Sequence, residues 1–131
     1  MKRRTHLGDY PVMGYVRLGT LQAPVSGLVD TGTKYSILPR DLAERAGSRP
    51  LGRTGKINIL KRTLHGEIHR VHVTDLEGGC RGDTTVFVPD ASADWKRGVL
   101  FGAEFLQDTG MHVNDKGEAY CPIKKKSRRK L

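Results

Sequence analysis

The residue with the clearest chemical potential is Asp30, which follows an apolar segment and is succeeded by Thr31, Gly32 and Thr33. A carboxylate placed directly after an apolar strand is drawn towards the core, where its ionised form is costly unless something stabilises it. The threonine hydroxyl can form local hydrogen bonds, and the glycine allows a sharp turn and the close approach of a neighbour. A second apolar segment, residues 35–38, ends at a proline. The pattern predicts a strand, a loop that presents a carboxylate, and a second strand.

A second motif lies about 70 residues further along, where an apolar run leads into glycine and then into a short helical pattern; it consists of Val99, Leu100, Phe101 and Gly102. Together, the two motifs resemble the two signatures of retropepsin-like aspartic proteases, and the resemblance covers residues 10–121. It implies a mostly β chain that folds as a small closed acid-protease barrel with two short helices, one lobe per chain. The short strands and the 16 glycines agree with this class.

The resemblance also implies a mechanism, in which two carboxylates share a proton and activate water to hydrolyse a peptide bond. Because the chain supplies one such aspartate, the active species would be a homodimer in which each chain contributes Asp30. Thr31 would bond across the twofold axis, and Gly32 would permit close approach of the two loops, which Thr33 completes. The substrate would be an extended peptide or protein segment, and no metal or other cofactor is required.

A hairpin between the two motifs corresponds by position to the flap that covers the active site in this family. Strands are expected at residues 57–60 and 64–73, and the tip is assigned to Leu60, Lys61, Arg62 and Thr63. Two features depart from the retroviral pattern: Gly102 is followed by alanine in place of arginine, and the tip has few glycines. The resemblance is therefore to the cellular and prokaryotic branch.

Other elements follow from local patterns. Further strands are expected at residues 10–17, 21–29, 84–89, 98–101, 111–113 and 119–121, and a polar loop at residues 48–55. Helices are expected at residues 39–46, before Gly47, and at residues 103–108, before Gly110, because glycine is common just after a helix end. The domain division is a basic arm at residues 1–9, a protease domain at 10–123 and a basic tail at 124–131.

Two competing sites are weighed against Asp30. A second Asp-Thr-Gly begins at Asp108, but no apolar pair precedes it and it coincides with the expected helix end, so it is interpreted as a coincidence. His65, His69 and His72 have the spacing of a metal site on a helix. The surrounding β-branched residues favour a strand, which separates the third histidine from the other two, so solvated histidines are the preferred interpretation.

The net charge of +9 belongs to the chain ends. Three cations lie before residue 5, and six lie in the tail: Lys124, Lys125, Lys126, Arg128, Arg129 and Lys130. The other 14 Lys and Arg residues balance the 14 Asp and Glu residues. Such arms can make weak, salt-sensitive contacts with nucleic acid or an acidic surface, or can simply be solvated. The alternatives to a protease are therefore a nucleic-acid-associated protein and a non-catalytic dimerisation or binding module with the same fold.

Cys80 and Cys121 match no metal-ligand or redox spacing. No apolar run approaches the roughly 18 residues of a membrane span, and no apolar stretch of the kind found in signal peptides follows the basic N-terminus. Two reduced thiols and a cytoplasmic location are therefore expected.

Overall fold

The computed structural model describes residues 12–59, 61–77, 79–115 and 119–122; the predicted arms, residues 1–9 and 124–131, lie outside this part of the chain. The elements in order are β1 (Val12–Leu18), β2 (Val25–Val29), β3 (Ser36–Ile37), α1 (Arg40–Ala46), β4 (Arg49–Ile59), β5 (Arg62–Asp75), β6 (Arg81–Pro89), the 3-10 turn η1 (Ala91–Ala93), β7 (Leu100–Phe101), α2 (Ala103–Thr109), β8 (His112–Val113) and β9 (Ala119–Tyr120). The described residues are thus mostly β with two short α-helices, as predicted.

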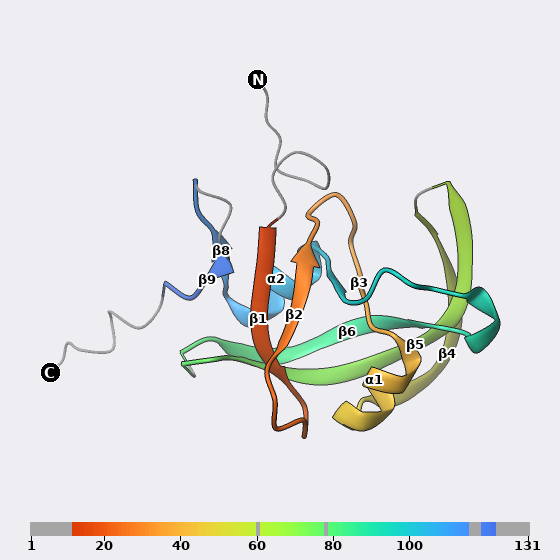
Figure 1. Ribbon diagram of the computed structural model, residues 1–131, viewed down its shortest axis with the longest axis horizontal. Coiled ribbons are helices and arrows are strands. Elements are labelled where there is room, and N and C mark those ends of the chain that lie inside the picture. The colour runs from red at the N-terminus through yellow and green to blue at the C-terminus, as the bar shows by residue number, and fades with distance from the viewer. Residues whose placement is uncertain (1–11, 60, 78, 116–118, 123–131) are drawn as a thin grey trace, which may run out of the picture.

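Six of the strands close into a barrel (Figure 1). Their order is β1-β2-β7-β3-β6-β5, and β5 pairs back with β1 to complete the ring. Strand β4 lies outside the ring, where it pairs with β5, and β8 and β9 form a separate two-stranded sheet. Because β2 and β7 run parallel as neighbours, the two sequence motifs lie side by side in the barrel. The predicted closed barrel is confirmed.

Successive residues of the central strands point into two different hydrophobic clusters, because side chains alternate between the faces of a strand. Val86 and Val88 belong to the larger cluster, whereas Phe87 belongs to the smaller one. The larger cluster includes the stacked rings of Phe101 and Phe105, whose centroids are 4.2 Å apart, and this stacking fixes α2 against the barrel. The smaller cluster includes residues next to the turn of the β4–β5 hairpin and consists of Ile37, Ile59, Leu64, Phe87 and Leu100.

Both helices end as the sequence predicted, at glycines in the left-handed conformation. Gly47 has a φ of 73° after α1, and Gly110 has a φ of 82° after α2. The second Asp-Thr-Gly is confirmed as a helix end, because Asp108 and Thr109 are the last residues of α2. Asp108 accepts a hydrogen bond of 2.8 Å from the hydroxyl of Thr84 and so links α2 to β6. Within the described residues, neither helix is long and apolar enough to cross a membrane.

The expected loop at residues 48–55 is wrong, because β4 begins at Arg49. This part of β4 is exposed and lacks apolar alternation, so periodicity gave no strand signal. Its strand conformation comes from pairing with β5, across an irregularity between Pro50 and Arg53. The expected strand at residues 21–29 is also shorter than predicted, since β2 begins at Val25, directly after a proline.

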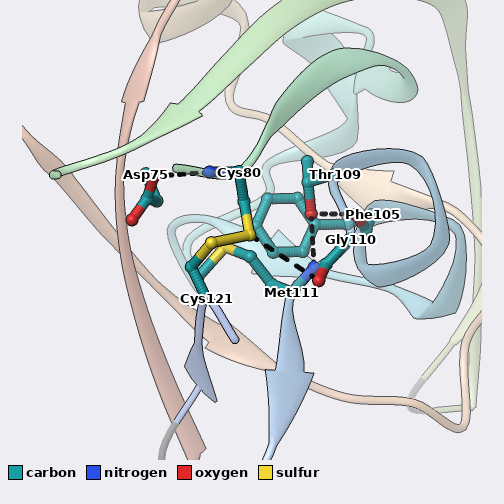
Figure 2. The surroundings of a disulfide bond; sticks show 7 residues. All are labelled: Asp75, Cys80, Phe105, Thr109, Gly110, Met111 and Cys121. Atoms are coloured by element: carbon teal, nitrogen blue, oxygen red, sulfur yellow. Dashed lines mark hydrogen bonds between the residues drawn. A yellow bond between two sulfur atoms is a disulfide. The ribbon is translucent and has the colours of Figure 1, made fainter. Parts of the chain in front are cut away.

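The prediction of two reduced cysteines is wrong as well: Cys80 and Cys121 form a disulfide (Figure 2). The two residues are 41 positions apart, and the bond joins the start of β6 to the segment that follows β9. Cys80 is buried, and its backbone N–H donates to Oδ1 of Asp75 at 2.9 Å, which fixes the turn before β6. Sequence spacing could not identify this pair, because only the folded barrel brings the two residues together.

Candidate active site

Asp30 lies directly after β2, at the start of a loop held by its own hydrogen bonds. Its N–H donates to the carbonyl of Phe101 on β7 at 2.9 Å, and its carbonyl accepts from the N–H of Thr33 at 3.2 Å and from the Thr33 hydroxyl at 3.1 Å. The N–H of Gly32 donates to Oδ1 of Asp30 at 3.0 Å. Oδ2 has no hydrogen-bond partner among the described residues. The half-buried carboxylate is therefore oriented by one oxygen and can bind a ligand through the other.

The residues after β7 attach this loop to the start of α2. The N–H of Ala103 donates to the carbonyl of Thr33 at 2.8 Å, and the N–H of Glu104 donates to the carbonyl of Lys34 at 3.0 Å. These two donors belong to the first turn of α2, which has no partners for them within the helix. The second motif thus positions the Asp30 loop through its backbone, so no particular side chain is needed at Ala103.

Gly102 is packed so closely against the Asp30 loop that a side chain would collide with it. A Cβ atom there would lie 2.6 Å from the carbonyl oxygen of Tyr35 and 2.7 Å from that of Lys34. The N–H of Gly102 donates to Oγ of Ser36 at 3.0 Å, and Ser36 is only 2% exposed. Ser36 is a positioning residue that sequence reasoning missed, because it lies inside an otherwise apolar segment. The sequence signal for this role was one hydroxyl side chain, that of Ser36, at a position expected to lie in an apolar strand.

Thr31 and Gly32 form the exposed end of the loop. The Thr31 side chain has no hydrogen bond within the described part of this chain. The expected bond across a twofold axis therefore stays a prediction.

The predicted hairpin is confirmed, and its strands are longer than expected. Ile59 pairs with Arg62, and the next pair, Asn58 and Thr63, is joined by a side-chain hydrogen bond of 2.7 Å. Lys61 turns the chain with a φ of 64°, and Leu60 lies outside the described residues. The guanidinium of Arg62 also donates to the carbonyl of Ala93, which fastens the tip to the η1 turn.

A pocket of about 210 Å³ lies between this hairpin and the Asp30 loop. Its lining comes from two segments, residues 32–35 of the loop and residues 57–59 of β4. Figure 1 shows the end of the hairpin on the same side of the molecule as the β2–β3 loop. The hairpin is therefore placed as a flap would be, and its function as a flap stays a prediction.

The three histidines weighed as a metal site do not converge. His65 is exposed, whereas His69 is buried, with Nδ1 2.7 Å from Oγ of Ser48 and Nε2 3.0 Å from Oε1 of Glu67. His72 is exposed on β5 and pairs with Asp83 at 2.8 Å. In the described residues no group of three or more His, Cys, Asp or Glu side chains could hold a metal ion.

Two of these histidines, His69 and His72, bond instead to neighbouring carboxylates. The hydrogen bond from His69, with a contribution from Arg40, lowers the pKa of Glu67 below its ordinary value. The hydrogen bond from His72 and the nearby arginines likewise lower the pKa of Asp83. The first pair lies within β5 and the second joins β5 to β6, and neither contacts the Asp30 loop.

Two solved structures resemble the fold of this chain over most of their length. The protease of EIAV, solved in complex with the inhibitor HBY-793, matches with a TM-score of 0.57 and 20% identity over 79% of this chain and 92% of that one. The retroviral protease-like domain of Ddi1 from Leishmania major matches with a TM-score of 0.53 and 20% identity over 83% of this chain and 85% of that one. This chain has the retropepsin-like fold. No protein-family model and no curated protein sequence matches it.

In this retropepsin-like chain, the two sequence motifs occupy adjoining strand ends, and a hairpin lies beside them. The two matched structures are one viral protease and one cellular protease-like domain at the same sequence identity. They therefore do not distinguish the branches, and the assignment to the cellular and prokaryotic branch stays a prediction.

Proposed function

We propose that the chain is an aspartic endopeptidase that acts as a homodimer, with Asp30 from each chain forming the catalytic pair. The observation that carries the proposal is the Asp30 loop itself. Its carboxylate is oriented by the N–H of Gly32, its backbone is fixed by β7 and α2, and Oδ2 is left without a partner in the described residues. A retropepsin-like barrel supplies the frame for this loop.

The chemistry follows from pairing two such carboxylates. Two like charges in contact do not both ionise, so the pair holds one proton. The ionised Asp30 takes a proton from water, and the water oxygen attacks the peptide carbonyl. The protonated Asp30 of the second chain gives its proton to the carbonyl oxygen, so that a tetrahedral gem-diol forms. The first Asp30 then passes the proton taken from water to the leaving nitrogen as the C–N bond breaks. The gem-diol returns one proton to the pair as it becomes the carboxylic acid product, so the pair again holds one proton. A single chain holds half of this site, so activity depends on protein concentration wherever the dimer dissociates.

The test compares the wild type with Asp30→Asn on a mixed peptide library between about pH 3 and pH 8. Loss of the general base predicts a decrease in kcat/KM of at least about a hundredfold, and the wild type should show a bell-shaped pH profile. Asp108→Asn is a matched control, because it alters the other Asp-Thr-Gly and keeps an oxygen that can accept from Thr84. Cleavage that survives Asp30→Asn refutes the proposal.

The oligomeric state separates the remaining outcomes. A dimer, measured by light scattering, that cleaves nothing would favour a non-catalytic dimerisation or binding module. A monomer that cleaves nothing at low concentration should gain activity as the concentration rises, and its failure to do so counts against the enzyme.

We further propose that the protease domain spans residues 10–123 and that the tail from residue 124 makes weak contacts with nucleic acid or an acidic surface. The Cys80–Cys121 disulfide favours an oxidising compartment, where disulfides usually persist, so the cytoplasmic location expected from the sequence stays a prediction.

A further inference from the structure

The β4–β5 hairpin carries an excess of positive charge that the overall balance of the body conceals. Residues 48–66 contain no Asp or Glu, and five cations: Arg49, Arg53, Lys56, Lys61 and Arg62. All five are exposed. Residues 57–59 of this segment lie beside the Asp30 loop, with a pocket between the two.

The structure leaves most of this charge uncompensated. Within the described residues, Arg53, Lys56, Lys61 and Arg62 form no ion pair. Arg49 acts only at longer range on Asp83, which already pairs with Arg70 at 3.6 Å and with a histidine. Arg40, which lies outside the hairpin, has carboxylate partners within 4 Å in Glu67 and Asp90. A group of uncompensated like charges attracts a partner of opposite charge.

Strand β4 also offers backbone groups to a partner. In the described part of the chain it pairs with β5 alone, so its other edge presents N–H and C=O groups along Arg49–Ile59. Figure 1 shows β4 and β5 running together along one side of the molecule to the end of the hairpin. An edge strand binds an extended peptide by adding it as a further strand, while a cationic edge disfavours pairing with a second strand of the same charge.

We propose that the open edge of β4 binds extended peptide segments rich in Asp and Glu, and so directs cleavage to acidic stretches of protein. This inference rests on the proposed peptidase activity and adds the substrate class. A peptide paired with β4 lies about 5 Å from it, within the length of Lys and Arg side chains. A nucleic acid fits less well, because residues 48–66 contain no Phe, Tyr or Trp on which bases could stack.

The experiment measures binding and cleavage with matched peptides. The two peptides of each pair share one scissile sequence and differ only in the residues that flank it. The flanking residues are Glu and Asp in one peptide and Gln and Asn in the other. Binding of fluorescein-labelled peptides is followed by anisotropy on the Asp30→Asn protein, which should not cleave them, and kcat/KM is measured on the wild type. Because several exposed charge pairs form with the acidic peptide, its affinity and its kcat/KM should each be about tenfold higher than those of the neutral peptide at 0.1 M salt. The preference should largely disappear at 1 M salt, where the Debye length is about 3 Å.

Matched variants locate the effect. The triple change Arg53→Gln, Lys56→Gln and Lys61→Gln should abolish the preference. A control that removes the same charge outside the hairpin, Arg17→Gln with Arg45→Gln and Arg81→Gln, should retain it.

The outcomes are distinct from those of the proposed activity. Cleavage that needs Asp30 but treats acidic and neutral peptides alike overturns this inference and leaves the peptidase intact. Tighter binding of single-stranded RNA than of the acidic peptide, lost in the same triple variant, also overturns it. A preference for acidic peptides without any cleavage supports the binding surface and counts against the peptidase alone.

Discussion

The Cys80–Cys121 disulfide allows a quantitative prediction about stability. Removing the cross-link, by reduction or by Cys121→Ala, restores conformational freedom to the unfolded chain. The residues are 41 positions apart. In the chain-entropy treatment, closing a loop of this length corresponds to about 4 kcal/mol at 25 °C. Dividing this loss of stability by the unfolding entropy of a chain of this size gives a decrease in Tm of roughly 10 to 15 °C.

The assay is thermal unfolding followed by circular dichroism, with and without a reductant, on the wild type and on Cys121→Ala. Reduction should lower the Tm of the wild type to near that of the variant, and should leave the variant unchanged. The wild type in reductant also retains both sulfurs, so any difference between it and the variant measures packing around Cys121. That residue is only half-buried, so the difference should be small.

Two results would refute this reasoning. Free thiols in the oxidised protein, detected by mass after alkylation, would mean that the bond does not form. A bond that forms but whose reduction changes the Tm by less than about 3 °C would mean that the described barrel does not depend on it. In that case β8 and β9 are held by packing around Met111, which is buried in the larger cluster.

Two further predictions concern the loop and the surface. Ser36→Ala removes the acceptor of the buried Gly102 N–H and should lower the free energy of unfolding by about 1–3 kcal/mol. Ser36→Thr is the control, because it keeps the hydroxyl. Equal stability of the Ala variant and the wild type in urea would contradict the prediction. The pKa of Glu67 is lowered in the folded state by His69, so its contribution to stability is complete above its ordinary pKa and is lost as the pH falls through the folded value. Acid unfolding should therefore be shallower for Glu67→Gln than for the wild type. The difference should be small, because the Glu67 side chain is 41% exposed and solvent screens its interactions. Parallel curves below pH 4.5 would contradict this.

The sequence by itself determined the features that depend on local chemistry. The two motifs, the turn at Lys61 and both helix ends could be predicted, because glycine, proline and apolar periodicity act over a few residues. The rejection of Asp108 as a second active-site residue also depended on local signals and is confirmed by the end of α2. The mostly β class followed from the number and spacing of short apolar runs.

Only the tertiary structure decided the features that depend on partners distant in the chain. The first half of β4 is a strand because β5 supplies its hydrogen bonds, although its own residues give no periodic signal. Cys80 and Cys121 form a bond because the barrel places the start of β6 beside the end of β9. Ser36 is a positioning residue because β7 brings Gly102 to it from 66 residues away. In each case the deciding contact is a pairing of distant segments, whose geometry a single sequence does not encode locally.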